Sequence, residues 1–306
     1  MRGATPLLLS SYRRDGNWRA AISCGPLLAD VADLNPSGRK YPSTVRGLLE
    51  SGTENVQKIL RAAETAFEDR SVQLRRLEET VIGPPVPDPD KIICLGLNYR
   101  EHASEIRMEV APVPTFFAKF RNALCGPYSP IVLPAVSTRV DYEGELAVVI
   151  GRRCRDVSGD EALGFVAGYT IMNDVSARDL QMQTSQWTAG KTPDTFAPMG
   201  PGIVPTSSIP DPQNLKITTR VNGVALQEGH TSEMIFPVAR TIAFLSSFMT
   251  LEPGDIISTG TPAGVGFKRQ PPIFLKAGDL VEVEVERIGT IRNPVVGSLP
   301  RADRTP

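Results

Sequence analysis

The sequence has no long apolar run and little net charge, and each absence removes a class of function. No stretch of about 18 apolar residues occurs, so the sequence predicts no membrane-spanning helix. The first 16 residues hold a run of only three leucines before two arginines, which is too short for the apolar part of a signal peptide. The net charge is −1, which leaves no basic field for nucleic acid or an anionic membrane.

The four cysteines are scattered and form no CxxC pair. This spacing excludes the usual structural zinc site and a disulfide framework, and it is typical of buried thiols in a reducing compartment. We therefore expect a cytoplasmic protein whose partner is a small molecule. These residues are Cys24, Cys94, Cys125 and Cys154.

A proline-rich segment, Gly83 to Lys91, can continue neither a helix nor a central strand, and it predicts a domain boundary. We expect a small N-terminal α+β domain, residues 1–86, and a catalytic domain, residues 87–306. Hairpins are predicted around Asp15-Gly16 and Asn222-Gly223. Helices are predicted at Ser176 to Gln183 and Pro237 to Met249, in an α+β fold dominated by packed sheet.

Three carboxylates lie at the ends of apolar, β-prone runs. Glu143 and Glu145 are two residues apart in a strand pattern, so their side chains share a face, and Asp174 follows a second such run. Oxygen ligands of this kind suit Mg²⁺ or a similar hard cation. The alternative for the Glu pair is a solvated strand face. Asp141 falls on the same face as a possible further ligand, although a residue at a strand entry is more often a cap or turn residue.

Only two histidines occur, and one of them has a carboxylate at helical spacing. His102 and Glu105 are three residues apart and can meet on one helical turn. A carboxylate beside an imidazole fixes its tautomer and raises its basicity, which suits it to remove a proton. The alternative is a surface ion pair. His230 has no partner at useful spacing, and we expect it to be structural or exposed.

Four further residues could bind an anionic substrate. Lys191, in a Gly- and Pro-flanked loop, could neutralise an oxyanion or a carboxylate near the metal, although most loop lysines are solvated. If Asp174 opens a helix, Arg178 and Gln181 share its face, and Arg178 could bind a carboxylate bidentately; an ordinary Asp–Arg helix pair is the alternative. The Gly-rich run around Thr261 could hold an anionic group, or could be a plain turn.

Taken together, these segments resemble the fumarylacetoacetate hydrolase superfamily, and its two-domain bacterial members in particular. The resemblance covers most of Lys91 to Val296, and the order and spacing of the segments make it specific. The matching stretches are GLNYREHASE, DYEGELAVVIG, GYTIMNDVSARDLQ, GKTPDTFAPMGP and LEPGDIISTGTPAGVG.

The resemblance implies a mixed β-roll catalytic domain and a homodimer. It implies that Mg²⁺ or Mn²⁺ is the cofactor, and it assigns roles to the candidate residues. The metal ligands would be Glu143, Glu145 and Asp174; the water-activating dyad would be His102 and Glu105; the contacts to a 2-oxo acid would be Arg178, Gln181, Lys191 and Thr261.

The main hypothesis from the sequence is a metal-dependent hydrolase that cleaves a carbon–carbon bond in a 2,4-dioxo acid, such as an acylpyruvate or fumarylpyruvate. Cleavage would proceed through an enolate held on the metal, with water activated by His102. The alternative is an isomerase or decarboxylase of a 2-oxo or 2-hydroxy-dienedioate, or of oxaloacetate, in aromatic or sugar-acid catabolism. A non-catalytic ligand-binding module is a third possibility, disfavoured by the retained dyad.

Overall fold

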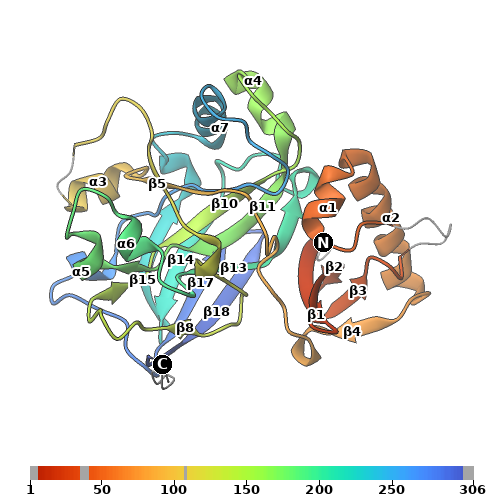
Figure 1. The fold of residues 1–306 in the computed structure, drawn as a ribbon, viewed down its shortest axis with the longest axis horizontal. Helices are drawn as coiled ribbons and strands as arrows, with labels where there is room; N and C mark the ends of the chain where they lie inside the picture. The colour runs from red at the N-terminus through yellow and green to blue at the C-terminus, as the bar shows by residue number, and fades with distance from the viewer. Residues whose placement is uncertain (1–5, 35–40, 107–108, 299–306) are drawn as a thin grey trace, which may run out of the picture.

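The computed structural model describes residues 6–34, 41–106 and 109–298, and sheets dominate it (Figure 1). The α+β class is confirmed, and the sheets are open. Within the described residues, no helix is long and apolar enough to cross a membrane. The predicted cytoplasmic location stays a prediction.

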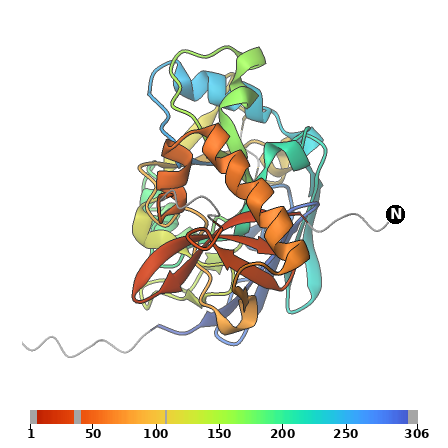
Figure 2. The ribbon, with the colours of Figure 1, turned by 90° about the vertical axis from the view of Figure 1, so that its right-hand side faces the viewer.

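The N-terminal module is a four-stranded antiparallel sheet beside two helices (Figure 2). Its hairpin is confirmed, because β1 and β2 pair from Leu8↔Ser23 to Arg14↔Asn17 around the predicted turn. Helix α2 is amphipathic, and Ile59 and Ala63 on its apolar face are buried. The elements are β1 (Leu8–Arg14), β2 (Asn17–Cys24), β3 (Leu27–Asp30), α1 (Val45–Glu50), α2 (Thr53–Asp69) and β4 (Leu74–Arg76).

The larger sheet runs through both parts of the chain. Its strand order is β4-β3-β2-β1-β13-β11-β10-β16-β5-β6, and β7 pairs with β13. Strand β1 joins β13 at Leu9 and Ile203, so the N-terminal sheet continues into the second part. Because this sheet is shared by the two parts, the predicted boundary between two domains at residues 86 and 87 stays a prediction. The new strands are β5 (Ile92–Gly96), β6 (Thr115–Ala118), β7 (Leu124–Cys125), β10 (Gly144–Ile150), β11 (Val166–Asn173), β13 (Ala197–Pro205) and β16 (Ile256–Ser258).

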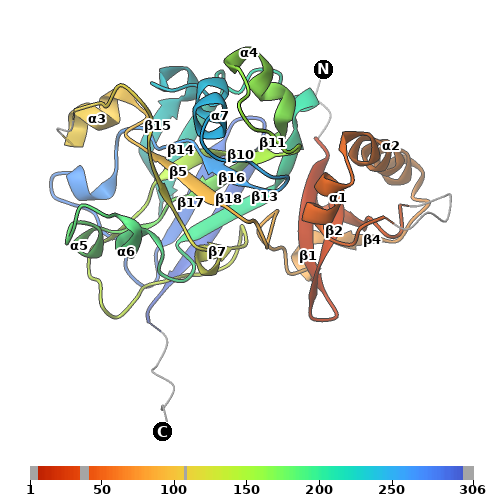
Figure 3. The same ribbon diagram turned by 45° about the horizontal axis from the view of Figure 1, so that its top comes forward.

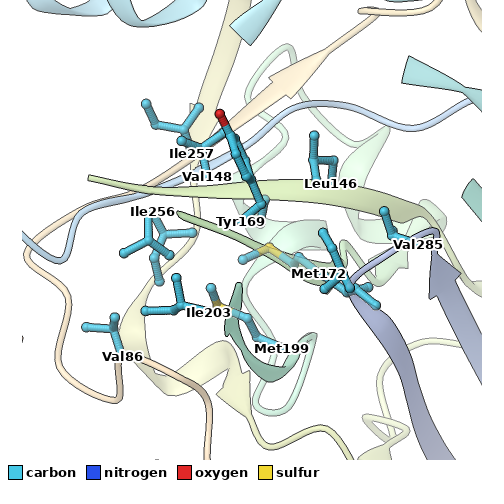
Figure 4. Close-up of a cluster of buried hydrophobic side chains, with 14 of the residues drawn as sticks. Val86, Leu146, Val148, Tyr169, Met172, Met199, Ile203, Ile256, Ile257 and Val285 are labelled. Carbon is cyan, nitrogen blue, oxygen red and sulfur yellow. The ribbon is translucent and has the colours of Figure 1, made fainter. Parts of the chain in front are cut away.

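A second, five-stranded sheet packs against the first. Its order is β15-β14-β17-β18-β8, and the predicted turn at Asn222 and Gly223 joins β14 to β15. Strand β10 contacts β14 and β17, and strand β11 contacts β17. The core lies between the two sheets, where Leu146 and Met172 approach Val285 (Figure 4). The strands are β8 (Ile131–Val132), β14 (Lys216–Val221), β15 (Val224–His230), β17 (Leu280–Val285) and β18 (Gly289–Val296).

The helices of this part are short. Three of them, α3, α5 and α6, lie at the end of the molecule away from α1 and α2 (Figure 3). The last helix, α7, lies within the range predicted for it. The helices are α3 (Arg100–Ile106), α4 (Gly159–Ala162), α5 (Arg178–Gln181), α6 (Thr188–Lys191) and α7 (Val238–Ser246).

The helix predicted from Ser176 to Gln183 is wrong at its start. Ser176 and Ala177 form a short strand, β12 (Ser176–Ala177), which pairs with β9 (Val140–Asp141). The Arg178 amide then donates to the Arg139 carbonyl, and only one helical turn, α5, follows. Asp174 therefore precedes a strand and does not open a helix, because sheet pairing satisfies the backbone there.

A buried carboxylate in the N-terminal module yields a stability prediction. Asp30 accepts from Tyr12 Oη at 2.5 Å, Arg14 Nη1 at 2.9 Å and the Ala32 amide at 2.9 Å. Burial raises the pKa of Asp30, but these donors and nearby Arg19 outweigh it and leave the pKa below its ordinary value. A depressed pKa stabilises the folded state above the unfolded pKa of about 3.9, and this contribution is lost as the pH falls through the folded value.

We expect Asp30→Asn to lower the free energy of unfolding at pH 7 by about 1–3 kcal/mol, because charged hydrogen bonds are lost. The difference from the native protein should shrink as the pH falls below about 3.9, because the carboxyl group of the unfolded chain is protonated there and that of the folded protein is protonated only at lower pH. Denaturant unfolding at pH 7 and pH 3.5 measures this. Asp15→Asn is the matched control, because the Asp15 side chain is 92% exposed. A pH-independent difference would contradict the charge argument.

Candidate metal and acid–base site

The three predicted metal ligands come together in one buried cluster. Glu143 immediately precedes β10, Glu145 lies in β10 and Asp174 immediately follows β11. Antiparallel pairing of Gly144 with Asn173 aligns the two strand ends, and the Asp174 amide donates to the Glu143 carbonyl at 2.8 Å. One oxygen from each carboxylate lies within 4.8 Å of the others, so the three can act on a single cation.

Two buried lysines neutralise much of this charge. Lys191, at the end of α6, donates from Nζ to Glu143 Oε2 at 2.8 Å and to Asp174 Oδ2 at 2.7 Å. Its placement beside the carboxylates is as predicted. Lys119, just after β6, donates to Asp174 Oδ1 at 2.5 Å. Lys119 was not predicted from the sequence, where its local signal is a lysine between Ala118 and Phe120, directly after an apolar run.

Glu145 is the least satisfied acid of the three. Its Oε2 accepts from Ser258 Oγ at 2.6 Å and from the Gly260 amide at 2.9 Å. Its Oε1 is buried and has no hydrogen-bond partner among the described residues. Burial, with the adjacent charges of Asp174 and Glu143, raises the pKa of Glu145 well above its ordinary value. A divalent cation would satisfy this oxygen and relieve the repulsion, so the donor set fits a hard metal ion.

Glu143 lies in the opposite environment. Burial raises its pKa, but the charges of Lys191 and Arg178, with a smaller contribution from His102, outweigh burial and lower the pKa to about 2. Arg178 Nη2 donates to Glu143 Oε1 at 2.6 Å. Glu143 is therefore ionised at neutral pH, and its ion pairs with Arg178 and Lys191 link the carboxylate cluster to α5 and α6.

The predicted acid–base pair is formed at 3.3 Å, between His102 Nδ1 and Glu105 Oε2. His102 is buried, with 6% of its surface exposed. Glu105 also accepts from the Gly264 amide, which ties α3 to the loop after β16. An ionised carboxylate only accepts hydrogen bonds, so Nδ1 donates and Nε2 is left as a free base. This arrangement suits His102 to act in proton transfer.

Comparison with known proteins fixes the family. The sequence model described as fumarylacetoacetate hydrolase C-terminal matches residues 91–296. The chain belongs to the fumarylacetoacetate hydrolase family. The mitochondrial oxaloacetate tautomerase FAHD2A of Bos taurus is 46% identical over 87% of this chain and 84% of its own length. The corresponding protein of Homo sapiens is 45% identical over the same shares.

Solved structures of the family agree with the fold. The fumarylacetoacetate hydrolase of Exiguobacterium antarcticum superposes with a TM-score of 0.80 at 35% identity and covers 95% of this chain and 99% of that chain. The maleylpyruvate hydrolase of Sphingobium reaches 0.77 at 30% identity, over 95% and 100% of the two chains. The resemblance found in the sequence is thus confirmed, and it extends through the N-terminal module.

Arg178 lies beside the carboxylate cluster, and its charge is already engaged by protein groups. It donates from Nε and Nη2 to Asp141 Oδ2, from Nη2 to Glu143 and from Nη1 to Gln181 Oε1, and it lies over the Phe267 ring at 4.3 Å. Asp141 lies in β9, and its oxygens also accept from the backbone amides of Tyr142, Gly266 and Phe267. The expected contact of Arg178 and Gln181 with a substrate stays a prediction.

Thr261 lies beside the start of β10, and its hydroxyl makes hydrogen bonds to other protein groups. Its hydroxyl donates to the Gly144 carbonyl at 3.0 Å and accepts from Gln227 Nε2 at 2.8 Å. Gln227 also accepts from the Gly144 amide, so the pair fixes the start of β10 beside the carboxylates. His230 ends β15 and bonds Ser232 at a tight turn, in agreement with a structural role.

Proposed function

We propose that this protein is a divalent-metal-dependent tautomerase that interconverts the enol and keto forms of oxaloacetate or a similar 2-oxo diacid. The observation that carries the proposal is the 46% identity, over most of both chains, to a named oxaloacetate tautomerase. The site supports it, because the reaction needs one acid–base group beside an electrostatically stabilised oxyanion. The alternative reached from the sequence is thus better supported than the main hypothesis.

Tautomerisation only moves a proton, and this chain supplies the groups to move it. The keto form loses a proton from C3 and gains one on the C2 oxygen, so the carbon skeleton stays intact. We assign the C3 proton to His102, held in its basic tautomer by Glu105. A divalent ion held by the triad would act as a Lewis acid toward the 2-oxo acid.

Carbon–carbon hydrolysis remains the second candidate, because the 30% identical neighbour is named a maleylpyruvate hydrolase. It would need the same base to deprotonate water instead of carbon. We also propose, from the family resemblance, that the protein is a homodimer with no nucleic-acid or membrane partner.

The test is the decay of enol-oxaloacetate, followed by its ultraviolet absorbance, with purified protein and added Mg²⁺ or Mn²⁺. We expect the decay to accelerate, to slow to the background rate with excess chelator, and to produce no pyruvate beyond the uncatalysed amount. An acylpyruvate is assayed in parallel. If the enol decay is unchanged with both metals while the acylpyruvate is cleaved, the hydrolase assignment replaces the tautomerase.

A further inference from the structure

Lys119 is a fully buried lysine that the proposed proton transfer does not use. Its ammonium donates to Asp174 Oδ1 at 2.5 Å and to the Val175 carbonyl at 3.1 Å, and its side chain has no exposed surface. Its amide donates to the Ile92 carbonyl, which anchors the segment to β5. Asp174 therefore has an ammonium group on each oxygen, because Lys191 holds Oδ2. A buried charge held in this way acts strongly on its neighbours.

The cluster as a whole is nearly neutral before any ligand is counted. Four buried carboxylates face three buried cations, so the fully ionised cluster carries one net negative charge. A divalent ion would make the total positive by one, and a dianion would bring it back to minus one. The carboxylates are Asp141, Glu143, Glu145 and Asp174, and the cations are Lys119, Arg178 and Lys191.

We infer that Lys119 is a positioning residue that sets the charge of this cluster, weakening the binding of the metal and strengthening the binding of a dianionic substrate. Without Lys119 the cluster would carry two negative charges and Asp174 Oδ1 would be free to act on a cation. Attraction for a divalent ion would rise and attraction for a dianion would fall. The substrate half of the inference rests on the proposed function, whereas the metal half needs no substrate.

The test compares Lys119→Gln, which removes the charge and keeps a hydrogen-bond donor, with Lys119→Arg, which keeps the charge. Mn²⁺ binding is measured by calorimetry, without substrate. We expect Lys119→Gln to bind Mn²⁺ more tightly, by a factor on the order of ten, and Lys119→Arg to stay near the native affinity. Lys91→Gln is the matched control, since Lys91 pairs with buried Asp255 at 2.8 Å outside the cluster.

Kinetics supply the second measurement. Lys119→Gln should raise KM for oxaloacetate several-fold while kcat changes by less than about twofold, because uniform binding of the dianion is lost. A general loss of structure would instead lower kcat and metal affinity together. Thermal unfolding is recorded for each variant, and Lys119→Met replaces Lys119→Gln if the latter does not fold.

The inference is overturned if a folded Lys119→Gln binds Mn²⁺ as the native protein does or more weakly, or if Lys91→Gln shifts the affinity equally. Failure of the proposed function is distinct from this. A native protein without oxaloacetate activity, but with the expected order of Mn²⁺ affinities, would remove the tautomerase assignment and leave the role of Lys119 intact.

Discussion

Glu145→Gln should make the metal-free protein more stable while it strongly weakens metal binding. The pKa of Glu145 is raised by burial and by the charges of Asp174 and Glu143, so its ionisation is unfavourable in the folded state. For a carboxyl group with a raised folded pKa, the penalty is absent at low pH and grows as the pH passes the unfolded value. A neutral glutamine avoids this penalty at pH 7. We expect the unfolding temperature in excess chelator to rise by roughly 2–4 °C, which corresponds to ~1 kcal/mol.

The matched variant is Glu143→Gln, two residues away, and it should move in the opposite direction. The pKa of Glu143 is about 2, because Lys191 and Arg178 outweigh the effect of burial. Its carboxylate therefore stabilises the fold at every pH above the unfolded value, and this contribution is lost as the pH falls toward 2. Removing the charge leaves buried cations under-paired and should cost about 3–5 kcal/mol at pH 7.

Both variants should weaken Mn²⁺ binding by more than about 100-fold, because each removes an anionic ligand. Calorimetry with Mn²⁺ and thermal unfolding in chelator together separate the two effects. Equal shifts of the unfolding temperature for both variants would contradict the division of the cluster into one strained and one paired carboxylate. Retention of Mn²⁺ binding by Glu145→Gln would remove Glu145 from the metal site.

The only residues of the carboxylate cluster that could be predicted from the sequence are those that belong to a local sequence pattern. Glu143 and Glu145 follow strand periodicity, and Asp174 follows an apolar run, so each is visible within a few residues. The hairpin turns at Asp15-Gly16 and Asn222-Gly223 are visible for the same reason, since the type of turn depends on two adjacent residues.

The remaining parts of the site depend on contacts between distant segments. Lys119 meets Asp174 across 55 residues, and Ser258 meets Glu145 across 113. No local pattern distinguishes such a lysine or serine from a solvated one. The pairing of β1 with β13, and of Ser176 with Asp141, is equally non-local, so neither the continuous sheet nor the strand before α5 could be anticipated.

His102→Ala should lower kcat for tautomerisation by about 10²–10⁴-fold, the range for loss of a positioned acid–base group. Mn²⁺ affinity should stay within about threefold of native, because among the described residues the side-chain hydrogen bond of His102 goes to Glu105 and not to Glu143, Glu145 or Asp174. Glu105→Gln should give a smaller loss, because the imidazole remains but its tautomer is no longer fixed.

The control is His230→Ala, which removes the second histidine of the chain at an outer turn and should leave kcat near native. Both enol decay and acylpyruvate cleavage are assayed for His102→Ala, which shows whether His102 acts in tautomerisation, in hydrolysis or in both. If His102→Ala loses both enol decay and acylpyruvate cleavage, one base serves proton removal from carbon and from water. If enol decay survives while cleavage is lost, His102 activates water only, and tautomerisation must draw its proton transfer from another group beside the carboxylates. Survival of both activities would remove His102 from the chemistry.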